Sequence, residues 1–382
     1  MSGGGPSAIV SRMVPPAVDD AIDPARIRRA LVIKLRHHGD VLLSSPVFTV
    51  LRHAAPHAEI DALVYLETAA MLERHPAISI VHTIDRRLKS RGPLAQLAGD
   101  GRLWRALRAR RYELVVHLTE HPRGAWLSRI AGARWSVAPE RERAGWFWRS
   151  CFTHRFLLPR ATPRHTVEAN LDALRRIGIW PDDEDKRLVH VPGSEAQARV
   201  ASLLAEHGLV RGRFAVVHPA SRWLFKCLPA GPTAAVVDRL AARGLAVVLT
   251  GAPDPAEAPL IAAVKAAATS PLVDLAGRLS MPELSALIAA ARLFVGCDTA
   301  PMHLAAAAGT PVVAWFGPSD ERSWGPWRVA HRVVASTIHP CRPCHNNGCG
   351  GSNNADCLLT LPGERVVAAV DALLDETAPA AR

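Results

Sequence analysis

The sequence of 382 residues lacks any stretch of about 18 uninterrupted apolar residues, the length that a membrane-spanning helix requires. Its N-terminus offers only a short apolar run at residues 8–10, which is too short for a secretory signal. We therefore expect a cytoplasmic protein in which residues 1–27 form a disordered leader.

Several well-known motifs are also absent from the sequence. No GxGxxG stands between a predicted strand and helix, which disfavours a dinucleotide oxidoreductase. Walker-A and GxSxG motifs are missing, which disfavours ATPases and α/β-hydrolases. The sequence also lacks zinc-finger spacing, a basic region that runs into heptads and an aromatic RNA-binding signature. We therefore expect no nucleic-acid partner.

Cysteine is scarce and unevenly placed. Three of the seven cysteines stand alone, at Cys151, Cys227 and Cys297. Their isolation argues against a disulfide scaffold. The other four cluster with three glycines, at Cys341, Cys344, Cys349 and Cys357. Four thiolates could form a tetrahedral zinc site, but the second pair lacks regular spacing, so we favour a loop of reduced thiols and expect no metal.

Basic residues are abundant, with a formal net charge of +11. Such an excess favours anionic partners. Arginines cluster at 102–111 and 141–149, which indicates either a face toward a membrane surface or acidic acceptor, or a solvated helix face. The neighbouring Trp-Phe-Trp at 146–148 could be core, an acceptor platform or a membrane-touching loop, and we expect core.

Apolar runs alternate with segments of helical period along the whole chain. The first run, at 30–35, is continuous, as in a parallel strand that is buried on both faces. A helix is expected at 93–109 with an inward stripe of Leu94, Leu97, Leu103 and Leu107. Strand-helix alternation of this kind predicts doubly wound parallel sheets, and the chain length predicts two domains.

The predicted domain boundaries follow from composition. Residues 28–180 form the N-terminal domain, 181–194 a polar, Pro- and Gly-containing linker, and 195–361 the C-terminal domain. An amphipathic helix at 362–376 is expected to pack back across the cleft on the N-terminal domain. Ligands of open α/β sheets bind beyond the carboxyl ends of the strands, so the cleft between the domains is the expected site.

Three loops at predicted strand ends carry polar residues. The loop at 36–40 holds Gly39 and Asp40, where the carboxylate could take a proton from a hydroxyl or only cap the next helix. The loop at 218–229 holds Ser221 and Lys226, which could bind a diphosphate, although a solvated surface lysine is the alternative.

The third loop opens a short Ala-rich helix between two apolar strands at 295–319. Pro301 suits the first turn and Gly309 ends the helix. A helix start of this kind presents backbone N–H groups and a positive dipole end, which suits phosphate. Asp298 or His303 could bind sugar hydroxyls, and Thr299 could bind phosphate, whereas a buried His303 satisfied by the backbone is the alternative reading.

Taken together, these loops resemble the bacterial lipopolysaccharide heptosyltransferases, glycosyltransferase family 9, over residues 30–374. The most specific piece is Asp-Thr-Ala-Pro-Met-His-Leu-Ala-Ala-Ala at 298–307, followed by Gly-Thr-Pro at 309–311, Phe-Gly-Pro at 316–318 and Trp-Gly-Pro-Trp at 324–327. Supporting pieces are His-Gly-Asp-Val-Leu-Leu at 38–43, Val-Val-His-Leu-Thr at 115–119 and Phe-Lys-Cys at 225–227. The chain looks most like the heptosyltransferase III branch, which decorates the inner core.

The resemblance implies a GT-B fold, in which two Rossmann-like domains face each other across a cleft. It also implies inverting transfer of heptose from ADP-heptose, with no obligatory metal or cofactor. Asp40 would be the catalytic carboxylate, and the donor would be held by Ser221, Lys226, Asp298, Thr299, Met302 and His303. The acceptor would meet Arg36, His38, Gly39 and Glu120.

The same resemblance implies a lipopolysaccharide inner-core acceptor and a monomer at the inner face of the inner membrane. The basic face would then serve an anionic, phosphorylated glycolipid. Alternatives are a related transferase that uses another heptose acceptor, in the manner of heptosyltransferases I and II, or another nucleotide sugar. A more remote alternative is an anion-binding protein without catalysis.

Overall fold

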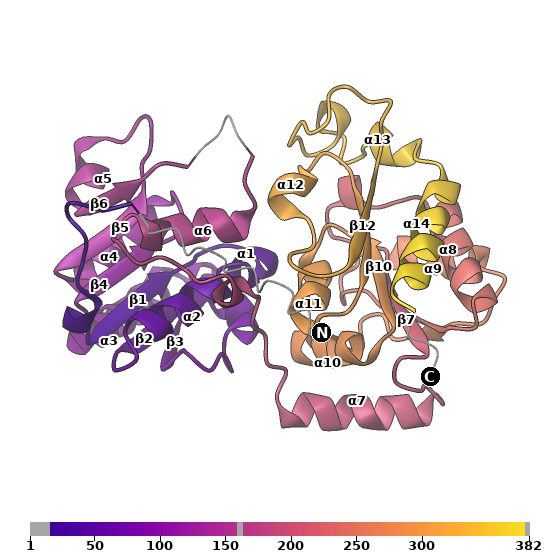
Figure 1. The fold of residues 1–382 in the computed structure, drawn as a ribbon, viewed down its shortest axis with the longest axis horizontal. Helices are drawn as coiled ribbons and strands as arrows, with labels where there is room; N and C mark the ends of the chain where they lie inside the picture. Colours follow the sequence, from indigo (N-terminus) through magenta and orange to yellow (C-terminus); the bar gives the residue numbers. More distant parts are fainter. Residues whose placement is uncertain (1–15, 159–162, 379–382) are drawn as a thin grey trace, which may run out of the picture.

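Two α/β domains lie side by side in the computed structural model, which describes residues 16–158 and 163–378 (Figure 1). Each domain is built on a six-stranded sheet, and the strand pairings in both sheets are parallel. The prediction of two Rossmann-like domains is therefore confirmed.

The N-terminal sheet has the strand order β3-β2-β1-β4-β5-β6. Its strands are β1 (Arg29–Ile33), β2 (Glu59–Tyr65), β3 (Ile80–Ile84), β4 (Leu114–His117), β5 (Trp135–Pro139) and β6 (His154–Phe156). The chain changes direction across the sheet between β1 and β4. Such a switch point is where open α/β sheets bind their ligands.

Helices cover both faces of this sheet because successive side chains of a strand point to opposite sides. The α-helices are α1 (His38–Leu42), α2 (Ser45–Ala54), α3 (Pro93–Arg110), α4 (Pro122–Ala131), α5 (Trp146–Ser150) and α6 (Thr166–Arg175). Short 3-10 helices are η1 (Pro24–Arg26), η2 (Leu66–Met71), η3 (Arg86–Arg91) and η4 (Glu184–Lys186). Leu31 and Ile33 pack under α3 and α4, whereas Val32 packs under α2 and α6.

The predicted inward stripe of α3 is only half correct. Leu107 is fully buried and Leu103 is packed against the same core, as expected. Leu94 and Leu97 are 81% and 64% exposed, so they were wrongly assigned to the core. At 3.6 residues per turn Leu94 lies about half a turn and Leu97 about a third of a turn around the helix from Leu103, and both face outward.

The aromatic segment at 146–148 is divided in the same way. Trp148 is buried in a small core with Phe152, which agrees with the expectation of core, but Trp146 is 79% exposed. The two tryptophans occupy different sides of α5, because positions two apart on a helix do not share a face.

The C-terminal sheet has the order β12-β11-β10-β7-β8-β9, which repeats the N-terminal arrangement strand for strand. Its strands are β7 (Phe214–His218), β8 (Ala246–Leu249), β9 (Val273–Asp274), β10 (Leu293–Cys297), β11 (Val312–Phe316) and β12 (His331–Ala335). The switch point of this domain therefore lies between β7 and β10.

The helices of the C-terminal domain also form two layers. They are α7 (Ser194–Glu206), α8 (Ala230–Ala242), α9 (Ala258–Ala267), α10 (Met281–Ala290), α11 (Ala300–Ala308), α12 (Glu321–Trp324), α13 (Asp356–Leu359) and α14 (Gly363–Glu376), with 3-10 helices η5 (Leu224–Lys226) and η6 (Cys349–Gly351). Helices α10, α11 and α12 lie on the side that faces the N-terminal domain (Figure 1).

Helix α14 does not pack on the N-terminal domain, which corrects the sequence prediction. Its apolar side, with Val366, Val370 and Leu373, is buried in the C-terminal core against α8. Its acidic side pairs with α8, where Arg243 Nη1 lies 2.7 Å from Asp371 Oδ1. Apolar and ionic contacts of the helix are thus both satisfied within its own domain.

The two domains share one continuous hydrophobic core, to which α2 and α6 contribute from one side and α10 and α11 from the other. Helix α1 contacts α11, and η2 contacts α10. Polar contacts reinforce the junction: Trp327 Nε1 donates to Lys186 O at 2.7 Å, and the His165 ring stacks on Trp327 at 4.3 Å. The strand ends of both domains are thereby held against each other.

The predicted leader at 1–27 falls partly outside the described residues, which begin at residue 16. From there the chain is packed on the N-terminal domain: Ile22 and Ile27 are buried, and Asp20 pairs with Arg176 at 2.6 Å. Apolar burial and an ion pair thus order the end of a segment that was expected to be disordered. Within the described part of the chain, none of the helices is long and apolar enough to cross a membrane.

Candidate active site

A cleft of about 620 Å³ lies where the switch points of the two sheets meet. The loop after β1 lines it from the N-terminal domain, and the loops after β7, β8 and β10 line it from the C-terminal domain. The three loops that were singled out in the sequence therefore converge on one cavity.

Asp40 lies in the first turn of α1 and lines the cleft in a half-buried position. The N-cap of α1 is His37, and no side chain caps this helix. Among the described residues, the Asp40 carboxylate accepts no hydrogen bond and forms no ion pair. The alternative of a helix-capping aspartate is therefore wrong, and the carboxylate is available to a ligand.

The loop that carries Asp40 is fixed from both sides. His38 Nε2 lies 2.7 Å from Glu67 O, and burial lowers the pKa of the His38 imidazole. The His37 ring meets Trp223 of the other domain edge to face at 5.2 Å, and Arg222 Nη2 lies 3.0 Å from His37 Nδ1. Arg36 is exposed at the rim of the cleft.

Lys34 precedes this loop and was not recognised in the sequence. It is buried, and its ammonium donates to Leu118 O at 3.2 Å and Asn170 Oδ1 at 2.9 Å. Burial lowers the pKa of the Lys34 ammonium to about 8. Lys34 thus ties the ends of β1 and β4 to α6, underneath the loop that presents Asp40.

On the C-terminal side, Lys226 is held by Asp298. Its Nζ lies 2.7 Å from Asp298 Oδ2 and 3.1 Å from Asp298 O, and 5.4 Å from the centre of the Trp223 ring. An ammonium has three N–H donors, so these two bonds leave one for a ligand. The alternative of a solvated surface lysine is wrong, because the side chain is only 17% exposed.

Ser221 and Thr299 stand beside this pair. Ser221 is buried, and its hydroxyl accepts a hydrogen bond from Trp223 N at 3.2 Å. Thr299 is the N-cap of α11, but its side chain does not cap the helix. Both residues line the cleft, so hydroxyl groups and the positive end of α11 face the same space.

His303 lies one turn into α11 and is 2% exposed. Its Nδ1 has no hydrogen-bond partner within the described parts of the chain, which contradicts the alternative of a histidine satisfied by the backbone. Burial lowers the pKa of His303 to about 4, so its imidazole is neutral. Its ring lies so close to Gly39 that a Cβ there would come within 2.9 Å of His303 Cδ2.

Two residues expected at the site lie elsewhere. Met302 is fully buried in the core and does not line the cleft, because its position on α11 turns toward the sheet. Glu120 is exposed beyond the end of β4, outside the lining of the cleft. Arg36, His38 and Gly39 do line it.

Glu257 is a lining residue that the sequence did not reveal. It follows β8, is 4% exposed, and its Oε2 accepts a hydrogen bond from Ala252 N at 2.9 Å. Burial raises the pKa of the Glu257 carboxyl above its ordinary value. The position of Glu257 in the sequence, after the second strand of a Rossmann-like domain, could have indicated its place at the site, since acidic residues there bind the ribose of nucleotides.

The four clustered cysteines are unpaired. Cys357 is buried, Cys344 is half-buried, and Cys341 and Cys349 are exposed. Within the described ranges, no group of three or more His, Cys, Asp or Glu side chains is arranged to hold a metal ion. The zinc hypothesis therefore has no support from the arrangement of these side chains.

Comparison with known sequences gives one consistent family. The model of glycosyltransferase family 9 (heptosyltransferase) matches residues 101–354. The chain is 34% identical over 342 residues to a lipopolysaccharide heptosyltransferase 3 of Escherichia coli, which covers 89% of this chain and 97% of the relative. It is 27% identical to lipopolysaccharide heptosyltransferase 1 of Pseudomonas aeruginosa, over 84% of this chain and 87% of the relative.

Solved structures share the fold. The glycosyl transferase family 9 protein from Veillonella parvula superposes with a TM-score of 0.80 at 23% identity, over 94% of this chain and 100% of that chain. The E. coli heptosyltransferase WaaC with ADP-2-deoxy-2-fluoro heptose superposes with a TM-score of 0.66 at 21% identity, over 92% and 100% of the two chains.

Proposed function

Because this chain belongs to glycosyltransferase family 9, we propose that it transfers heptose from ADP-heptose to the inner-core oligosaccharide of lipopolysaccharide, as a heptosyltransferase III. The observation that carries the proposal is the opposition of two half-sites across one cleft. An unpaired carboxylate, Asp40, stands on one side, and the Lys226–Asp298 pair stands with the start of α11 on the other.

Asp40 is the proposed general base. Its carboxylate takes the proton of the acceptor hydroxyl while the hydroxyl oxygen attacks the anomeric carbon of the heptose. The bond between that carbon and the diphosphate oxygen breaks on the opposite face, so the configuration inverts and ADP leaves. The absence of a hydrogen-bond donor to Asp40 among the described residues supports this role, since both carboxylate oxygens remain open to the acceptor hydroxyl.

The C-terminal half-site is the proposed donor site. The remaining N–H donor of Lys226, the Ser221 and Thr299 hydroxyls and the positive end of α11 stabilise the negative charge that develops on departing ADP. His303, which lines the cleft, would accept or donate one bond to the sugar. Glu257 is placed to accept hydrogen bonds from the ribose hydroxyls.

The N-terminal half-site is the proposed acceptor site. Arg36, which is exposed at the rim, pairs with anionic groups of the inner core. His38 and Gly39 line the cleft beside Asp40 and contact the acceptor. We place the enzyme at the cytoplasmic face of the inner membrane, where a lipid-anchored acceptor is available. Both half-sites come from one chain, so the proposal requires only a monomer.

Release of ADP from ADP-heptose, measured with heptose-deficient core glycolipids of graded length, tests the activity. A heptosyltransferase III releases ADP with the inner-core acceptor that already carries its first heptoses. If another nucleotide sugar supports turnover in place of ADP-heptose, the donor assignment is wrong. If every acceptor leaves ADP-heptose intact, the proposed reaction is refuted.

The variant Asp40→Asn tests the catalytic role. General base catalysis contributes about 10²- to 10⁴-fold, so turnover should fall by that factor, while ADP affinity measured by calorimetry stays within about twofold. Asp254→Asn is the matched control, because Asp254 lies at the same cleft on the donor side and its carboxylate accepts a hydrogen bond from the nearby Ala256 N. Equal losses in both variants would remove Asp40 from the role of base.

A further inference from the structure

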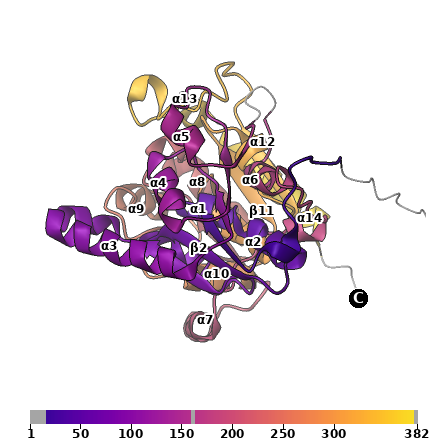
Figure 2. The ribbon, with the colours of Figure 1, turned by 90° about the vertical axis from the view of Figure 1, so that its left-hand side faces the viewer.

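The outer helical layer of the N-terminal domain exposes an unusual set of large apolar side chains. They are Leu94 (81% exposed), Leu97 (64%) and Trp104 (44%) on α3, Trp126 (56%) on α4 and Trp146 (79%) on α5. Exposed apolar residues that stand singly are ordinary, but these belong to three helices on one side of a single sheet. In Figure 2 these helices lie one above another at the left of the domain, with α5 above α4, α4 above α3, and α3 reaching outward.

The side chains form one surface rather than separate spots. On α3, Leu97 and Trp104 lie on the same face as Asp100, because they are three and four residues away from it. On α4, Trp126 lies on the same face as Arg123, which is three residues away. Arg123 Nη2 and Asp100 Oδ1 lie 2.7 Å apart, which places these two faces side by side. The Trp126 ring then packs on Phe147 of α5 at 4.4 Å.

The same layer carries the basic excess of the protein. Residues 86–155 contain sixteen Lys and Arg and five Asp and Glu, a net charge of +11 that equals the net charge of the whole chain. On α3, Arg105 and Arg108 share the outward stripe with Leu94 and Leu97, on the side of the helix away from Leu103, which packs against the core. The guanidinium groups of Arg102, Arg108 and Arg143 make no hydrogen bond or ion pair within the part of the chain that the structure describes.

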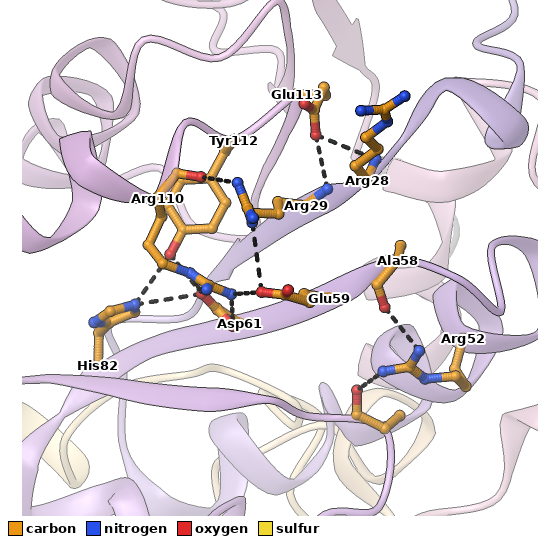
Figure 3. Close-up of polar contacts among 11 residues, drawn as sticks. Arg28, Arg29, Arg52, Ala58, Glu59, Asp61, His82, Arg110, Tyr112 and Glu113 are labelled. Atoms are coloured by element: carbon orange, nitrogen blue, oxygen red, sulfur yellow. Dashed lines mark hydrogen bonds and ion pairs between the residues drawn. The ribbon is translucent and has the colours of Figure 1, made fainter.

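Helix α3 is held firmly enough to present this stripe. Its C-terminal end is fixed by buried Asp61 of β2, whose carboxylate accepts from Arg110 Nε at 2.8 Å and from Tyr112 OH at 2.7 Å (Figure 3). His82 of β3 and Glu59 of β2 complete the network around Arg110 and Tyr112. The anchored end leaves the N-terminal half of the helix, with Leu94 and Leu97, projecting from the domain.

We propose that α3, α4 and α5 form a docking face that binds the surface of an anionic phospholipid bilayer. Leucine and tryptophan side chains enter the headgroup region, and the arginines around them pair with lipid phosphates. A second copy of the chain fits the face poorly, because two such surfaces would bring two strongly basic segments together. The proposal extends the proposed function, since it identifies the surface that would hold the enzyme beside a lipid-anchored acceptor.

Sedimentation with large unilamellar vesicles tests the proposal directly. The full-length protein should bind vesicles of phosphatidylglycerol and phosphatidylcholine, should bind pure phosphatidylcholine at least about tenfold more weakly, and should be released by high salt. Leu94→Ser with Leu97→Ser should lower the partition coefficient by about tenfold or more. Arg105→Glu with Arg108→Glu should lower it by roughly 10³-fold, since the two changes shift the charge by four units and each unit near an anionic surface changes the partition coefficient about fivefold.

Val210→Ser with Arg211→Glu is the matched control. These residues form an exposed apolar and basic pair on the C-terminal domain, where Val210 is 63% exposed, and the control should bind as the wild type does. Thermal unfolding at wild-type temperature verifies that each variant is folded. Equal binding to both vesicle types, or α3 variants that bind like the wild type, would overturn the proposal. A dimer that dissociates in the α3 variants would overturn it too, by identifying the face as a self-association surface.

The vesicle measurement does not depend on catalysis. With a delipidated, water-soluble acceptor, the α3 variants should release ADP from ADP-heptose at the wild-type rate. If the proposed function is wrong, the wild type will bind vesicles but release no ADP. If the docking face is wrong, turnover will be intact and vesicle binding will be absent or insensitive to the α3 changes.

Discussion

Replacing Gly39 by alanine should slow catalysis by forcing the two half-sites apart. Gly39 adjoins Asp40 on α1, and its Cα faces the ring of His303 on α11 across the domain boundary. A Cβ at residue 39 would lie 2.9 Å from His303 Cδ2 and 3.5 Å from His303 Nε2. Carbon atoms in contact normally lie about 3.5–4.0 Å apart, so residue 39 and the His303 ring must move apart by at least about half an ångström.

The expected magnitude follows from this displacement. His303 is 2% exposed, so its ring has little room to turn aside and α1 must shift with Asp40. A misplacement of about 1 Å can cost about 100-fold in rate, and half of that distance corresponds to about tenfold, or about 1.4 kcal/mol in the activation barrier. The KM for ADP-heptose should change by less than about twofold, because the residues that we propose to bind the diphosphate lie on the other domain.

Steady-state kinetics of ADP release measure the effect, and Gly101→Ala provides the control. Gly101 lies within α3, where a Cβ would meet no atom within 4 Å. Its replacement should leave kcat unchanged and stabilise the protein by about 0.5–1 kcal/mol, because glycine is costly inside a helix. If Gly39→Ala behaves in the same way, with a higher melting temperature and wild-type kcat, the close approach does not position Asp40 and the reasoning is refuted.

Two further predictions concern charge. Lys226→Ala should weaken ADP binding, measured by calorimetry, by about 10- to 100-fold, which is the contribution of a hydrogen bond to a charged group. Lys265→Ala is the control: it removes a comparable Lys–Asp pair, with Asp274, outside the cleft, and ADP affinity should not change. Stability should fall on acidification because burial lowers the pKa of four histidines to about 4, namely His75, His165, His218 and His303. In the unfolded chain these histidines have a pKa near 6.5, so between pH 6.5 and 4 they are protonated there but remain neutral in the folded protein. Each histidine therefore lowers the free energy of unfolding by about 2 kcal/mol at pH 5. Urea unfolding at pH 7 and pH 5 measures this loss, and an unchanged midpoint would contradict it.

Much of the fold was predictable because burial on both faces of a parallel sheet leaves continuous apolar runs in the sequence. The run at 30–35 and the one before Asp298 could be placed as strands, so the polar loops after them could be placed at strand ends. The start of α11 was predictable for the same reason, together with Pro301 and Gly309 at its two ends.

Features that depend on three-dimensional packing could not be predicted. Leu94 and Leu103 are the same residue type on opposite sides of one helix, and the way in which α3 packs on the sheet decides which of them is buried. Met302 adjoins His303 in sequence but turns toward the sheet. The role of Glu257 depends on how the loop after β8 approaches the cleft, and that of Lys34 depends on Asn170, which is 136 residues away.

The uneven charge makes the molecule a strong electric dipole. Outside residues 86–155 the chain carries equal numbers of acidic and basic residues, so the positive pole coincides with the layer of α3, α4 and α5. A negatively charged plane exerts a torque on such a dipole within roughly a Debye length, about 10 Å at 0.1 M salt. The protein is therefore turned before it touches the plane, and its first collision is with the face that carries the tryptophans.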